Sequence, residues 1–174
     1  IDSDENRISL SWKAPQDEVF SYQLFRSKND GKLGLIKTID NPKELGSDLF
    51  ANAVAAYEKY AQKCIIVDFG TALTFTAVSG NAEVLGVAIV PGLKTAMNSL
   101  FSKTAQLPEV PLKLPQKTIG TNSIHSIQSG ILFGYEGLVR NMLERIKAEL
   151  GIDCKVIATG GLSSIITTLT DEFD

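Results

Sequence analysis

Asp68-Phe69-Gly70-Thr71 places an acid, a turn-forming glycine and a hydroxyl at the end of an apolar run. An aspartate at the end of a buried strand is costly unless it is hydrogen-bonded, paired or bound to a cation. Gly70 lets a phosphate approach the backbone, and Thr71 and Thr74 add hydroxyl donors. The segment is typical of a hairpin that holds phosphate or a cation; the alternative is an aspartate that caps its own turn.

A second glycine turn, Thr159-Gly160-Gly161, also follows an apolar run. The stretches 64–71 and 154–161 share the order of cysteine, apolar strand, then a small or hydroxyl residue with glycine. Paired glycines place a backbone flat against a nucleotide, or simply form a turn before a helix. The sequence contains neither Gly-x-x-x-x-Gly-Lys-Ser/Thr nor Gly-x-Gly-x-x-Gly, which excludes a Walker P-loop and gives no support to a dinucleotide fold.

Asp48 is a third candidate, because a carboxylate at the start of a helix can orient or deprotonate a hydroxyl. The alternative is that Ser47 and Asp48 form an ordinary helix cap. The single histidine, His125, follows a plausible cap by three residues, a position more typical of a solvated side chain than of a base. Cys64 lies in an apolar run and is more typical of an inert buried thiol than of a nucleophile.

The composition narrows the class of protein. In 174 residues, 44% are hydrophobic and 21% charged, the balance of a globular chain. The net charge of −3 argues against a nucleic-acid partner, since such surfaces carry a basic stripe. Two cysteines make neither a disulfide framework nor a four-ligand zinc site, and no signal-peptide pattern opens the chain. The longest apolar runs are too short to span a membrane. We therefore expect a cytoplasmic protein.

The elements that must position these residues are predicted by periodicity and turn signals. A helix is expected over 47–60, with Phe50, Val54 and Tyr57 on one face. The remaining predictions are strands over 7–12, 64–69, 73–78, 84–90 and 154–158, helices over 93–101 and 121–150, and an extended proline-rich loop over 107–114. Glycines at 130, 134 and 137 within the long helix suggest close packing against another backbone, either in this chain or in a second copy.

Several motifs occur in a fixed order along the chain. They lie at 41–48, 51–53, 68–75, 91–93, 100–108, 119–123, 128–130 and 158–162. In this order they resemble the signature of type III pantothenate kinase, and the resemblance covers about residues 41 to 162. It implies an α/β protein with the ribonuclease-H-like fold of the actin-like ATPase and sugar kinase superfamily. Residues 1–60 would form a partial N-terminal half with a linking helix, and residues 61–174 the C-terminal half.

The resemblance also implies an activity. The family phosphorylates pantothenate with ATP, the first step towards coenzyme A, as a cytoplasmic homodimer that uses Mg²⁺ and a monovalent cation, K⁺ or NH₄⁺. By the same resemblance Asp48 is the catalytic base and Asp68 the metal-binding carboxylate. The nucleotide-binding residues are Gly70, Thr71, Thr74, Gly160 and Gly161, and the pantothenate-binding residues are Gly46 and Ser123.

Two departures from the family pattern keep an alternative open. The family's first phosphate loop contains a glycine that residues 1–6 lack, and its Asp-Arg pair is Asp48-Leu49 here. Residues 1–40 are also too few for the family's first half, so segments are either missing from this sequence or reduced in this member. The alternatives to a kinase are a weakened homologue with a regulatory or binding role, such as a transcriptional accessory factor, and a purely structural dimer partner.

Overall fold

A computed structural model of the chain describes residues 2–4, 7–9, 27–28, 31–32, 40, 44–102, 110–163 and 165–174. Two short antiparallel pairs come first, β1 (Asp2–Asp4) with β2 (Arg7–Ser9), and β3 (Ser27–Lys28) with β4 (Gly31–Lys32). The predicted strand over 7–12 is confirmed for Arg7–Ser9, and its last three residues lie outside the described part.

A four-stranded mixed sheet organises the rest of the described chain. Its strands are β5 (Cys64–Phe69), β6 (Ala72–Val78), β7 (Val84–Pro91) and β8 (Lys155–Thr159), in the spatial order β7-β6-β5-β8. The β5-β6-β7 meander is antiparallel, and β8 pairs in parallel with β5. The predicted strands are confirmed, with end shifts of one residue in β6, β7 and β8.

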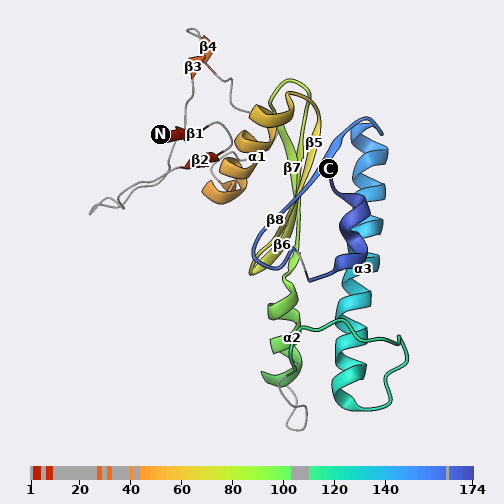
Figure 1. The fold of residues 1–174 in the computed structure, drawn as a ribbon. Helices are drawn as coiled ribbons and strands as arrows, with labels where there is room; N and C mark the ends of the chain where they lie inside the picture. Colours follow the sequence, from red (N-terminus) through yellow and green to blue (C-terminus); the bar gives the residue numbers. More distant parts are fainter. Residues whose placement is uncertain are drawn as a thin grey trace, which may run out of the picture.

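Helices cover both faces of this sheet (Figure 1). The helix α3 (Ser123–Leu150) packs on the face formed by Ile65, Val67 and Phe69, and this larger core also includes Phe75 and Leu132. The helix α1 (Ser47–Tyr60) packs on the opposite face, against a smaller core that contains Cys64 and Ile66. Burial on both faces explains why β5 reads as a continuous apolar run rather than an alternating one.

The predicted bounds of α1 are confirmed, but its cap and its buried face differ from the prediction. Gly46 occupies the N-cap position with no side-chain hydrogen bond, so the Ser47-Asp48 cap is wrong. The buried residues are Leu49, Ala53 and Ala56, rather than Phe50, Val54 and Tyr57. Small alanines bring the helix backbone close to the sheet, and the larger side chains pack at the margin of that contact.

The long helix α3 extends well beyond the sheet. Its C-terminal end is held just before β5, where Lys63 Nζ donates to Leu150 O at 2.8 Å. Near its middle, Tyr135 Oη donates to Pro91 O at 2.6 Å, at the end of β7. The turns before Tyr135 lie beside α2 (Leu93–Ser102), as Figure 1 shows, with Met97, Val110 and Ile127 buried between them. The C-terminal 3₁₀ helix η2 (Thr167–Glu172) is held to α3 by an Arg140–Glu172 ion pair.

Candidate functional site

The polar residues of interest gather where β5 ends, on the face of the sheet that α1 covers. Asp68 pairs in register with Thr74 of β6 and with Thr159 of β8. Directly paired residues project from the same face of a sheet, so these three side chains lie in one row. The glycine turns that were predicted separately from the sequence, at Gly70 and Gly160, therefore flank a single aspartate.

The helix α1 adds two more polar side chains to this cluster. Asn52 Nδ2 donates to Asp68 Oδ2 at 2.9 Å, and Asp48 lies one helical turn before Asn52. The Asp48 carboxylate is exposed, and it is close enough for its charge to act on Asp68. The structure therefore brings together two of the predicted site residues, Asp48 and Asp68, which are 20 positions apart in the sequence.

The surroundings of Asp68 disfavour its negative charge. Burial raises the pKa of this carboxyl above its usual value, the hydrogen bond from Asn52 lowers it, and the charge of Asp48 raises it again, with a net rise in pKa. Two carboxylates in one partly buried cluster repel each other. A bound cation would reverse this balance, because a positive charge favours the ionised form.

Gly160 and Gly46 allow the backbone to lie directly against these carboxylates. Gly160 has a φ of +93°, and a Cβ there would lie 2.6 Å from Asp68 Oδ1 and 2.7 Å from the backbone nitrogen of Phe69. A Cβ on Gly46 would lie 2.5 Å from Asp48 Oδ1. Gly161 is open, with nothing within 4 Å of an added Cβ. Gly160 therefore requires glycine, both for its φ and for its contact with the Phe69 backbone, whereas at Gly46 the exposed Asp48 side chain could turn away.

Thr74 provides a test of whether a cation fits here. Its side chain is 7% exposed, and its Oγ1 has no hydrogen-bond partner among the described residues. An orphaned buried hydroxyl beside a carboxylate is a donor set for a hard cation, which prefers oxygen. Within the described part of the chain no three acidic, histidine or cysteine residues form a metal cluster. The residues fit a cation that phosphate oxygens and water help to hold, as is usual for Mg²⁺.

The β5–β6 turn is fixed by the start of α2. Thr71 O accepts hydrogen bonds from Gly92 N at 2.9 Å and from Thr95 Oγ1 at 2.7 Å. A Cβ on Gly92 would lie 2.3 Å from Gly70 O, so only glycine permits this contact. The Thr71 side chain remains exposed. The roles of Gly92, Thr95 and Asn52 were not predicted from the sequence, although Pro91-Gly92 and Asn52 belong to the ordered motifs described above.

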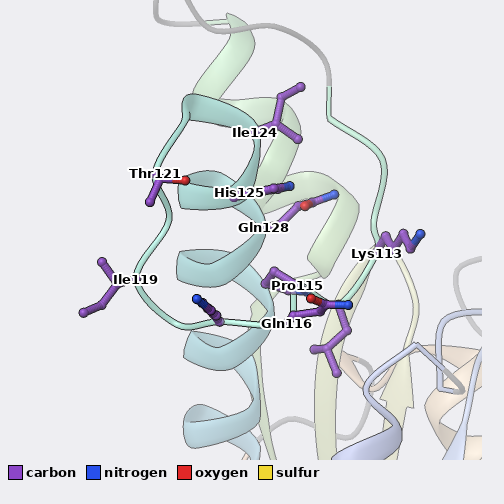
Figure 2. Close-up of a pocket in the computed structure, with 10 residues that line it drawn as sticks. Lys113, Pro115, Gln116, Ile119, Thr121, Ile124, His125 and Gln128 are labelled. Carbon is purple, nitrogen blue, oxygen red and sulfur yellow. The ribbon is translucent and has the colours of Figure 1, made fainter.

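Ser123 lies away from this cluster within one chain. It is exposed at the first position of α3, twelve residues before Tyr135, or about 18 Å along the axis. Nearby is a cavity of about 430 Å³ between residues 113–121 and the first turns of α3 (Figure 2). His125 and Gln128 line it, and Gln128 Nε2 donates to Pro111 O at 2.9 Å. The predicted pantothenate residues Gly46 and Ser123 are thus not brought together within one chain.

A mixed α/β fold with a four-stranded sheet and an acidic strand end between glycine turns is consistent with the actin-like ATPase fold. The family model for type III pantothenate kinase matches residues 8–145. The chain belongs to the type III pantothenate kinase family. None of the helices that the structure describes is both long and apolar enough to cross a membrane.

Curated relatives agree with this family. The chain is 50% identical over 135 residues to the type III pantothenate kinase of Koribacter versatilis, covering 78% of this chain and 49% of that protein. It is 45% identical over 137 residues to that of Myxococcus xanthus, covering 79% and 54% respectively. The chain therefore spans about half the length of the curated relatives it matches.

Among the solved structures that the chain resembles, one shows the likeness in fold. It is described as a conserved putative Baf family transcriptional activator from Campylobacter jejuni, with a TM-score of 0.55. The alignment covers 82% of this chain and 62% of that one, at 20% identity. At that identity the likeness concerns the fold alone.

Proposed function

We propose that the protein transfers the γ-phosphoryl group of ATP to pantothenate, giving 4′-phosphopantothenate, the first step of coenzyme A biosynthesis. The observation that supports this best is the position of Asp68 at the end of β5, between the Gly70 and Gly160 turns, where the helix that carries Asp48 contacts it through Asn52. Membership of the type III pantothenate kinase family supplies the reaction. Phosphoryl transfer suits such a site, since its catalysis is mostly positioning and charge stabilisation.

Asp48 is the base in this proposal. Its exposed carboxylate accepts the proton of the pantothenate hydroxyl, whose oxygen then attacks the γ-phosphorus in line. The bond from that phosphorus to its bridging oxygen breaks, and ADP leaves. Gly46, whose added Cβ would collide with Asp48 Oδ1, leaves room for this carboxylate and for substrate. Leu49, at the position of the arginine in the family's Asp-Arg pair, is 9% exposed and lies on the buried face of α1, so it offers no charge to the carboxylate of pantothenate.

The remaining site residues hold the nucleotide. The N–H of Gly70 already donates to Ala72 O at 3.1 Å, so Gly70 contributes a turn rather than a donor. The hydroxyl of Thr71 is exposed and free to reach a phosphate. The turn at Gly160 and the open space at Gly161 would let a phosphate approach the backbone closely. Asp68 and the hydroxyl of Thr74 would hold Mg²⁺ or a monovalent cation, K⁺ or NH₄⁺, which would supply charge neutralisation of the phosphates.

We further propose a cytoplasmic homodimer, with residues 1–60 as a partial N-terminal half and 61–174 as the C-terminal half of a duplicated fold. Support for dimerisation comes from α3. Gly130, Gly134 and Gly137 are exposed, and an added Cβ at any of them would meet nothing within 4 Å, so they do not pack closely against the described chain. Ser123, about 18 Å beyond the level of Tyr135, would then serve a pantothenate site shared between copies.

The test is ADP release that depends on both ATP and pantothenate, with Mg²⁺ and K⁺ present. The parent protein should show it, and Asp48→Asn should lower the rate by about 100-fold or more, the scale of general-base catalysis. Asp153→Asn is the matched control, because Asp153 is an exposed aspartate outside the site. Phosphorylation of pantothenate by Asp48→Asn at the parent rate would refute the role of Asp48, and a parent without pantothenate-dependent turnover would refute the kinase.

A further inference from the structure

Asn52 stands in an unusual place for its residue type. It lies in the middle of α1, between Ala51 and Ala53, where asparagine is a poorer helix former than its neighbours. Its side-chain amide does not bond to its own helix in the contacts that the structure gives. Instead Asn52 Nδ2 crosses to the sheet and donates to Asp68 Oδ2 at 2.9 Å, a contact between residues 16 positions apart.

This contact engages one of the two oxygens of the Asp68 carboxylate. With Oδ2 held by Asn52, the other oxygen, Oδ1, lies against the second glycine turn, 2.6 Å from the place a Cβ of Gly160 would occupy. No hydrogen-bond donor to Oδ1 is present among the described residues. The oxygen on the side of the glycine turns is thus the one left available for a ligand.

Asn52 is also a neighbour of both acids of the site. It lies one turn after Asp48 on α1, and its neutral amide is bonded to Asp68 in a cluster where the two carboxylates repel. An amide N–H can donate to a carboxylate without adding charge, whereas a lysine would neutralise the acid that a cation needs.

We infer that Asn52 is a positioning residue, which orients Asp68 so that Oδ1 faces the Gly70 and Gly160 turns and binds the cation of the phosphoryl-transfer site. The inference rests on the proposed function for the role of the cation. The contact of Asn52 with Asp68 is independent of it. Outer residues that orient a metal-binding carboxylate change metal affinity or activity by about 10- to 100-fold when removed.

The experiment measures Mn²⁺ binding by electron paramagnetic resonance, in the presence of the non-hydrolysable nucleotide AMPPNP. Asn52→Ala and Asn52→Leu should each weaken Mn²⁺ binding by about 10- to 100-fold. Leucine keeps most of the volume and favours a helix, so equal losses in both variants indicate the lost donor rather than lost packing. Asn98→Ala, at an exposed asparagine of α2, is the control and should bind as the parent does.

Kinetics separate positioning from a structural role. In both Asn52 variants the cation concentration for half-maximal rate should rise by about the same factor as the Mn²⁺ dissociation constant, while the KM for pantothenate stays at the parent value. Parent-like Mn²⁺ binding in Asn52→Ala, or a loss in Ala that Leu restores, would overturn the inference. A parent that binds no Mn²⁺ with AMPPNP would overturn it too. Weakened Mn²⁺ binding in a protein without kinase activity would refute the proposed function and leave the positioning role intact.

Discussion

The two faces of the central sheet differ in polarity and in role. The α3 face is apolar along the whole of β5 and β6, and its core joins Ile65, Val67, Phe75 and Leu132 with the C-terminal segment. The α1 face is apolar only where β5 begins, around Cys64 and Ile66. Where β5 ends, the same face carries Asp68 and the Thr74 hydroxyl, which has no hydrogen-bond partner in the part of the chain that the structure describes. Most of the apolar packing thus lies on the α3 face, and the polar site residues lie at one end of the α1 face. The packing on the first face stabilises the strand, which can therefore carry polar groups that are costly to bury.

The largest expected effect is on the α3 face. Phe75 is 1% exposed in the larger core, so Phe75→Ala should lower the free energy of unfolding by about 3–5 kcal/mol, through lost burial and the cavity left behind. Urea denaturation followed by circular dichroism measures this. A loss below about 1 kcal/mol would mean that the α3 face is not the main source of stability.

The next effect is at the polar end of the α1 face. Gly160→Ala puts a Cβ at a φ of +93° and 2.6 Å from Asp68 Oδ1, which should cost about 1–3 kcal/mol in stability. It should also abolish the response to Mg²⁺, because Asp68 must move. Gly161→Ala is the matched control: its added Cβ meets nothing within 4 Å, so stability should stay near that of the parent. Equal losses in the two variants would show that the turn, rather than the contact with Asp68, is what matters.

The sequence predicts the elements of both faces, but not the contacts that form between them. Helix α1, strand β5 and the long helix α3 follow from local periodicity and turn residues, and their predicted bounds agree with the structure to within two residues. Asp68 and the glycine turns were identified because strand ends and glycines are local signals. The bond from Asn52 to Asp68 was not predicted, since it depends on how α1 packs across the sheet. The position of Ser123 likewise depends on how far α3 runs past the sheet.

Asp68→Asn should separate stability from function. Without a cation, the variant should be slightly more stable than the parent at neutral pH, because it removes a partly buried charge that Asp48 repels. The folded-state pKa of Asp68 lies above its unfolded value, so the ionised carboxylate lowers stability once the pH exceeds both values. The gain in the variant should therefore disappear as the pH falls through the carboxyl range.

Thermal unfolding of parent and Asp68→Asn across that pH range measures this difference. The variant should meanwhile lose about 100-fold in pantothenate-dependent turnover, since the amide keeps the shape and removes the charge that a cation needs. A variant that is less stable than the parent at neutral pH, or one that retains full turnover, would indicate that Asp68 merely closes its hairpin.

The smallest effect concerns the two cysteines, which the sheet places on opposite faces. Cys64 pairs in register with Lys155, so Cys154 projects to the other side, and the two thiols pack in different cores. Burial, with smaller contributions from Cys154 and Asp174, raises the pKa of Cys64 to about 11, and burial likewise raises that of Cys154. At pH 8 both are therefore thiols, and only the half-buried Cys154 should react with iodoacetamide, slowly, in the folded protein.

Mass spectrometry after native and denaturing alkylation distinguishes the two sites. A Cys64–Cys154 disulfide after mild oxidation, or equal native labelling of both, would contradict the separation of the faces on which this comparison depends.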